Sequence, residues 1–94
     1  MQAFDFEQYQ NDAKSRGFDE VVPRDWPANT TSPIHTHPFS VEGLVVKGEM
    51  WLTVDDATTH LKPGDKFTLG VETPHMERYG ADGATYWAAR RNGR

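Results

Sequence analysis

Apolar residues near the start of the chain recur with the period of a helix. Three of them lie at positions i, i+3 and i+7, on one face of a helix: Phe6, Tyr9 and Ala13. Asp5 is a suitable N-cap residue, and Gln8 three residues later completes a capping-box pattern. Basic residues and then a glycine follow, as is typical of a helix C-terminus. The pattern predicts one short α-helix over residues 5–16, packed on the outside of a sheet.

The rest of the chain shows the patterns of strands and turns. Prolines interrupt residues 18–38, so extended pieces and edge strands are expected there. Residues 44–46 are continuously apolar, Gly48 interrupts them, and residues 50–54 alternate between apolar and polar, as in a strand. Further short strands are expected near residues 58–61, 67–69, 75–79 and 85–89, with turns at 55–56, 63–65, 70–74 and 80–83. This spacing predicts an antiparallel sandwich or barrel over about residues 20–90.

Composition narrows the class of protein. The 94 residues suit a single domain, and a hydrophobic share of 36% suits one packed core. The net charge of -4 argues against nucleic acid or an anionic membrane as the main partner. The chain has no cysteine, which excludes disulfides and thiol catalysis. We find no apolar run of membrane-spanning length and no visible signal peptide, so a cytoplasmic location is expected.

Candidate chemistry begins at His35-Thr36-His37. Residues two apart on a strand face the same side, so both imidazoles could reach one metal ion at about 2.0–2.1 Å. Taken alone, an HxH pair is more often two surface or partly buried histidines. His60, which lies between threonines in another predicted strand, is expected to face solvent.

The surroundings of this pair resemble the cupin superfamily. His35-Thr36-His37 leads through Val41-Glu42 into an apolar strand and a glycine, and the turn Pro63-Gly64-Asp65 precedes Pro74-His75. The resemblance covers about residues 30–88. It implies an all-β fold, a small jelly-roll or double-stranded β-helix barrel with the short helix outside. It also implies that His35, His37 and His75 are metal ligands at the barrel mouth.

Glu42 is the expected fourth ligand if the first motif carries one additional residue before its glutamate. Without that residue Val41 occupies the glutamate position, and Glu42 is a solvated carboxylate on the outer face. The two side chains face opposite sides of a regular strand, so only one can point inward. The second motif departs from the family pattern in having Gly70, Glu72 and Tyr79 where proline, glycine and asparagine are usual, and Asn29 replaces the leading glycine of the first motif.

Glu77 lies two residues beyond His75, so both share one strand face. A carboxylate inside an apolar barrel is costly unless it is paired or bound to a metal. Glu77 is therefore expected to be either a catalytic general base or another metal ligand. The alternative is an ion pair with Arg78 or another arginine near the rim.

These residues lead to two functional hypotheses. The first is a metal-dependent enzyme of dioxygenase, isomerase or lyase type, with one divalent transition metal ion (Fe, Mn, Ni, Zn or Cu) per chain and a small organic substrate. The second is a non-catalytic module that binds or senses a small molecule, as in cupin-containing transcription regulators. A homodimer is also expected, because residues 41–54 are densely apolar, with Leu44, Val46 and Trp51 as candidate interface residues.

Overall fold

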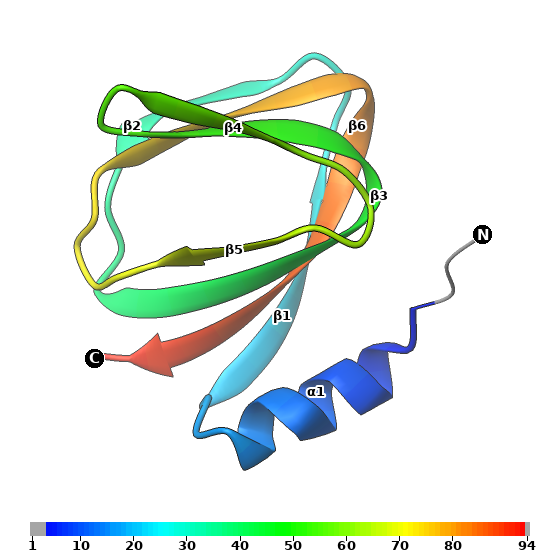
Figure 1. Cartoon of the computed structure of the whole chain (residues 1–94), viewed down its shortest axis with the longest axis vertical. Helices are drawn as coiled ribbons and strands as arrows, with labels where there is room; N and C mark the ends of the chain where they lie inside the picture. The colour runs from blue at the N-terminus through cyan, green and yellow to red at the C-terminus, as the bar shows by residue number, and fades with distance from the viewer. Residues whose placement is uncertain (1–3, 94) are drawn as a thin grey trace.

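A computed structural model describes residues 4–93 as a curved antiparallel sheet with one helix beside it. The elements are α1 (Phe6–Ser15), β1 (Glu20–Trp26), β2 (Thr31–His35), β3 (Phe39–Val54), β4 (Ala57–Leu61), β5 (Lys66–Leu69) and β6 (His75–Asn92). The main strand order is β1-β6-β3-β4, while β2 pairs with β6 and β5 with β3. The strands curl into a barrel, and α1 lies outside it next to β1 (Figure 1). The predicted all-β jelly-roll class is confirmed.

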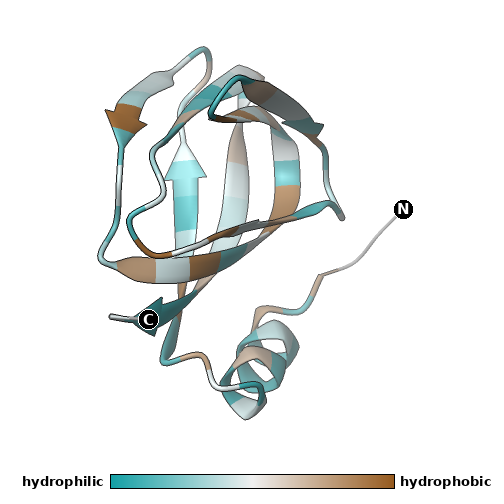
Figure 2. Ribbon diagram, turned by 60° about the vertical axis from the view of Figure 1, so that its left-hand side comes forward, coloured by the Kyte–Doolittle hydropathy of each residue, from teal (hydrophilic) through white to brown (hydrophobic). Residues whose placement is uncertain are grey.

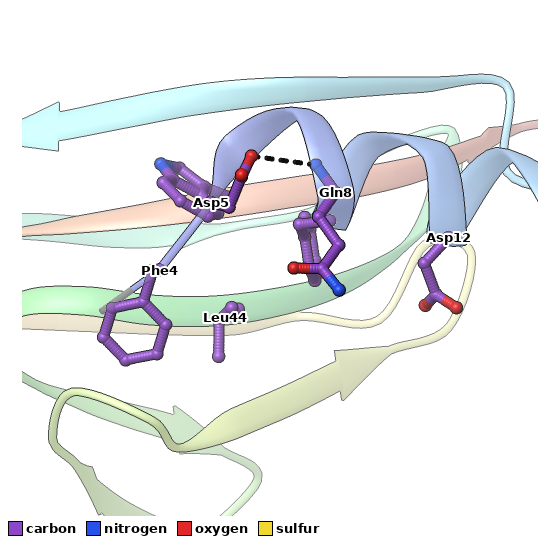
Figure 3. Close-up of a pocket in the computed structure, with 7 residues that line it drawn as sticks. Phe4, Asp5, Gln8, Asp12 and Leu44 are labelled. Atoms are coloured by element: carbon purple, nitrogen blue, oxygen red, sulfur yellow. Dashed lines mark hydrogen bonds between the residues drawn. The ribbon is translucent and has the colours of Figure 1, made fainter. Parts of the chain in front are cut away.

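Helix α1 begins as its sequence predicts. The carboxylate of Asp5 accepts a 3.1 Å hydrogen bond from the backbone N–H of Gln8 (Figure 3). This bond satisfies one of the unpaired N–H groups at the helix start. Tyr9 and Ala13 are buried against the barrel, and Phe4 and Leu44 line a pocket between the helix and the strands.

The helix covers an apolar patch on the outer face of the sheet. The buried residues of this contact come from the helix, the following loop and the sheet: Tyr9, Ala13, Phe18, Val21, Leu44 and Ala89. Val46 and Trp87 pack against it. Leu44 and Val46 therefore pack within their own chain. Of the three residues expected at a dimer interface, Trp51 is the one outside this cluster. The homodimer itself stays a prediction.

Strands β3 and β6 are longer than the sequence predicts. Each continues through the break expected at its glycines, where the pairing of β3 with β6 is interrupted between Gly48–Ala84 and Met50–Tyr79 and then resumes. Gly48 and Gly83 both adopt positive φ, +72° and +73°, and a Cβ at Gly48 would come within 2.1 Å of the Gly83 carbonyl oxygen. Only glycine fits this close backbone approach. The turn predicted at residues 80–83 is wrong, because these residues lie within β6.

The bulges also change which positions face the barrel interior, from odd-numbered residues before the bulge to even-numbered residues after it. On β3, Val41 and Val45 belong to the interior cluster before the bulge, and Met50 and Leu52 after it. The inward parity has therefore changed from odd to even. The same occurs on β6, where Glu77 and Tyr79 are buried before the bend and Tyr86 and Ala88 after it. Figure 2 shows hydrophobic and hydrophilic positions interleaved along these strands.

Prolines lie where a missing N–H does no harm. Pro23 is in β1, which among residues 4–93 pairs only with β6, so one side of β1 is a free edge there. Pro33 is in β2, where the pairing with β6 is irregular between Ser32 and His35. Within residues 4–93, no helix is long and apolar enough to span a membrane.

Candidate metal centre

Three histidines from two strands and a loop converge at one end of the barrel. His35 ends β2 and pairs with His75 at the start of β6, and His37 lies in the loop before β3. One candidate ligand atom from each of the three lies within 4.8 Å of the other two. His75 is buried, with 3% of its surface exposed, while His35 and His37 are partly exposed toward the mouth.

Backbone carbonyls orient two of the imidazoles. Nδ1 of His35 lies 2.7 Å from the carbonyl oxygen of Pro33, and Nδ1 of His75 lies 2.8 Å from that of Thr73. A carbonyl oxygen only accepts, so each Nδ1 carries the proton and donates. The neutral ring then has its lone pair on Nε2, the atom available to a metal. Such outer hydrogen bonds fix the tautomer and the orientation of metal-binding histidines.

Glu77 lies beside this cluster, inside the barrel. Its Oε2 atom is 3.5 Å from Nε2 of His35 and 3.7 Å from Nε2 of His75. Its Oε1 atom accepts hydrogen bonds from the hydroxyls of Tyr79, at 2.7 Å, and Tyr86, at 3.1 Å. Glu77 has only 4% of its surface exposed, so these two hydroxyl donors replace the water that burial removes from its carboxylate. One oxygen is thus held by tyrosines and the other faces the imidazoles.

The pKa values around Glu77 follow from burial. Burial raises the pKa of Tyr86 to about 12, with the nearby charge of Glu77 adding to the shift, and burial raises that of Tyr79 further. Both hydroxyls therefore stay protonated at neutral pH and donate to Glu77. The pKa of His37 is lowered, first by burial and then by the neighbouring His35 and His75. His37 is thus biased toward the neutral form that a metal requires.

The donor set fits a divalent transition metal. Two ligand atoms bound tetrahedrally at 2.0–2.1 Å are about 3.4 Å apart, and the candidate atoms of the three histidines lie within 4.8 Å of one another, so small ring movements would bring them onto one ion. Imidazole nitrogens with carboxylate oxygen suit zinc, iron, nickel, manganese and copper. His35, His37 and His75 are the residues that would hold the ion, with Glu77 beside it.

Glu42 does not join this group, which corrects the expected ligand set. Its carboxylate accepts a 2.7 Å hydrogen bond from Arg16, the C-cap residue of α1, and lies 3.9 Å from Nζ of Lys66. The strand keeps its regular alternation here, so Val41 points into the barrel and Glu42 points out toward the helix. The additional residue that would have turned Glu42 inward is absent.

Other residues singled out in the sequence lie outside the barrel. His60 stacks on Trp51 at 4.4 Å between ring centroids, and its Nε2 atom is 3.2 Å from Glu49. The guanidinium of Arg78 lies 3.9 Å from the centroid of the same Trp51 ring. Arg78 is therefore on the opposite face from Glu77, and the alternative of a Glu77–Arg78 ion pair is not what the structure shows.

Sequence reasoning did not assign the two tyrosines that hold Glu77. Tyr79 was detectable, because it follows Glu77 by two residues on the same strand and so shares its face. Tyr86 lies beyond the bend of β6, where the inward parity has changed, and no local pattern marks it. Trp26 stacks on Tyr79 with ring centroids 4.9 Å apart, which fixes the orientation of the Tyr79 ring.

Comparison with known proteins agrees with this geometry. Residues 24–87 match the family described as "Cupin domain". This match spans well over half of the chain, and the chain belongs to the cupin family.

Individual relatives differ in how much they share with the chain. An uncharacterised HTH-type transcriptional regulator of Haemophilus influenzae is 44% identical over 39 residues, which are 42% of this chain but only 13% of that protein. The DMSP lyase DddQ of Ruegeria pomeroyi is 25% identical, with a TM-score of 0.66 over 77% of this chain and 36% of its own. A protein of unknown function from Rhizobium leguminosarum is 12% identical, with a TM-score of 0.75 over 98% of this chain and 99% of that one. The last comparison shows the fold alone.

Proposed function

We propose that this cupin is a metal-dependent enzyme that acts on a small organic molecule inside the barrel. The observation that carries the proposal is the convergence of His35, His37 and His75, whose candidate ligand atoms lie within 4.8 Å of one another. Two of the rings are already turned by backbone carbonyls so that Nε2 is free. A histidine cluster that only formed hydrogen bonds would not need this shared orientation.

A metal ion held by His35, His37 and His75 would supply a Lewis acid for an oxygen of the substrate. Three protein ligands leave at least one position open for that oxygen, as in catalytic sites generally. The open side is the barrel mouth, because His35 and His37 are partly exposed there while His75 is buried.

Glu77 is the proposed proton acceptor. Tyr79 and Tyr86 fix its Oε1 atom, so Oε2 keeps one position next to the imidazoles. A carboxylate fixed in this way can take a proton from a carbon or oxygen next to the polarised group without reorganising. Proton transfer of this kind supports isomerase or lyase chemistry among the activities expected from the resemblance. The similarity to a lyase of the same fold is consistent with that choice.

The second candidate function is ligand sensing without turnover. It is favoured by the similarity to part of an HTH-type transcriptional regulator, which this chain matches over 39 residues. In that case the same site would bind a small molecule, and Glu77 would hold the ligand and not transfer a proton.

Cobalt titration tests the metal site. Metal-free protein is titrated with Co²⁺ and followed by visible absorption, beside His75→Ala and the matched control His60→Ala. We expect one Co²⁺ per chain in the parent and the control, and a loss of binding in His75→Ala. Equal binding in all three, or none in the parent, would reject the site.

Deuterium exchange separates an enzyme from a sensor. The zinc-loaded protein is incubated in D₂O with a set of small carbonyl compounds, and loss of their α-proton signals is followed by proton NMR. Catalysed exchange that Glu77→Gln abolishes supports the enzyme. Ligands that bind without exchange support the sensor and contradict the role given to Glu77.

A further inference from the structure

We infer that Arg24 and Arg90 form a carboxylate-binding subsite inside the barrel, and that the ligand of this cupin is therefore a small organic carboxylate. The inference rests on the proposed function, because it names the class of molecule that the same cavity takes. It concerns two residues that neither the histidine motif nor the Glu77 network uses.

Both arginines line the cavity that contains the metal-site residues. Arg24 comes from β1 and Arg90 from β6, two strands that pair directly. The same cavity is lined by His37, His75 and Glu77. Their placement follows the alternation of the strands, since Arg90 continues the inward positions of Tyr86 and Ala88 on β6.

Neither guanidinium has an anionic partner among residues 4–93. No ion pair joins either of them to a carboxylate in this part of the chain, and the Nε atom of Arg90 is buried without a hydrogen-bond partner. The one carboxylate in the cavity wall, Glu77, is already held by Tyr79 and Tyr86. A buried guanidinium N–H without an acceptor costs free energy, and a bound carboxylate would supply the acceptor.

Aromatic rings hold the two guanidinium groups in place. The Cζ atom of Arg24 is 5.2 Å from the centroid of the Trp26 ring, and that of Arg90 is 4.6 Å from the centroid of the Phe39 ring. A guanidinium that lies over a ring keeps the N–H groups in its own plane available. That planar fork matches the two oxygens of a carboxylate, which favours a carboxylate over a single-point anion.

The rest of the cavity wall limits the size and polarity of the ligand. Apolar side chains complete the wall between the arginines and the imidazoles: Val41, Phe67, Leu69 and Ala88. The cavity as it stands holds about 20 Å³, so a short aliphatic ligand would enter only with movement of side chains at the mouth. Its carboxylate would then lie on the arginines and its reacting group toward His37 and His75. The net charge of the chain is -4, so this interior is a local positive site in an acidic protein.

Glu20 is the competing partner within the chain. It lies opposite Arg90 in the register of β1 with β6, yet no ion pair joins the two side chains. If Glu20 neutralised Arg90 in solution, its removal would open the subsite and strengthen the binding of an added carboxylate. The variant Glu20→Gln measures that contribution directly.

The test uses sodium propionate as the probe and propionamide as its neutral counterpart. Binding is followed by the ¹⁵N–¹H NMR signals of the arginine Nε–H groups, first in metal-free protein and then with zinc. We expect saturable shifts of Arg24 and Arg90 with propionate, none with propionamide, and at least about tenfold weaker binding in Arg90→Gln. Arg90→Lys keeps the charge but not the fork and should fall in between. Arg78→Gln, on the outer face, should bind as the parent does.

The outcomes separate this inference from the proposed function. Absence of propionate shifts in a protein that still binds zinc, or equal affinity in folded Arg90→Gln and in Arg78→Gln, would overturn the carboxylate subsite and leave the metal site standing. Propionate binding at the arginines of a protein that takes up no metal would support the subsite and reject the metal-dependent function. Shifts confined to the zinc-loaded protein and insensitive to Arg90→Gln would mean that propionate binds the metal only, which also overturns the subsite.

Discussion

The hydroxyl of Tyr79 lies 2.7 Å from Oε1 of Glu77, and both residues are almost fully buried. A hydrogen bond to a charged acceptor in such surroundings contributes more than a bond between neutral groups. Because the same carboxylate faces His35 and His75 through its other oxygen, the pair links the barrel interior to the candidate metal site.

We predict that Tyr79→Phe lowers the free energy of unfolding by about 1.5–3 kcal/mol, because Glu77 loses its shortest hydrogen bond in a buried site. Tyr86→Phe should cost less, since its bond is longer at 3.1 Å. Urea unfolding of both variants measures the difference. In a Glu77→Gln background the cost of Tyr79→Phe should shrink, and an unchanged cost would show that the hydroxyl acts independently of the carboxylate.

We predict that acid lowers the free energy of unfolding of the metal-free protein through protonation of His37. Its pKa is lowered in the folded state, mainly by burial, so the unfolded chain takes up a proton first, near the ordinary value of about 6.5. The free energy of unfolding contributed by neutral His37 is therefore present above that pH and is lost as pH falls through the folded-state pKa. Urea midpoints across this range should fall less in His37→Gln than in the parent. A drop of the same size in both would contradict this assignment.

Gly43 is predicted to tolerate no side chain. A Cβ at this position would lie 2.2 Å from Cζ of the buried Phe67 ring, which packs edge-on to Tyr86. Gly43→Ala should destabilise the barrel by about 1–3 kcal/mol, because the ring must move in a filled core. The matched control is Gly70→Ala, where the nearest atom is Thr73 Oγ1 at 3.4 Å. Equal thermal stability of the two variants would disprove the packing argument.

Glu42→Gln is expected to leave metal binding unchanged. The side chain pairs with Arg16 on the outer face, and Arg16 is 39% exposed, so breaking this pair should cost no more than about 1 kcal/mol. Metal content and urea unfolding of the same preparation test both parts. Loss of metal from a folded Glu42→Gln protein would restore Glu42 to the ligand set.

The sequence predicts local features well where one short pattern decides them. The helix and its Asp5 cap follow from spacing and capping chemistry. The two-residue spacing of His35 and His37 predicts that the two imidazoles lie together, and they do, although His37 lies in the loop after β2. Within β3, Val41 faces inward, so strand alternation places Glu42 outside. The expectation that Glu42 points inward assumed one additional residue before the glutamate of the first family motif.

Bulges explain why the inward-facing side chains of β3 and β6 could not all be predicted from the sequence. Gly48 and Gly83 each look like strand ends, but both lie within long strands whose inward parity changes there. A change of one residue in parity moves every later side chain to the other face. The inward positions of Tyr86 and Arg90 depend on that change, so they could not be assigned from local sequence.

The most direct test of the metal site is the metal content of the protein as purified without a tag. Elemental analysis is made on the parent, on the His35→Ala/His75→Ala double variant and on the His60→Ala control. We predict about one transition metal ion per chain in the parent and the control, and none in the folded double variant. The same metal content in the double variant, or no metal in the parent even after incubation with iron, manganese, nickel, copper and zinc, would contradict the account.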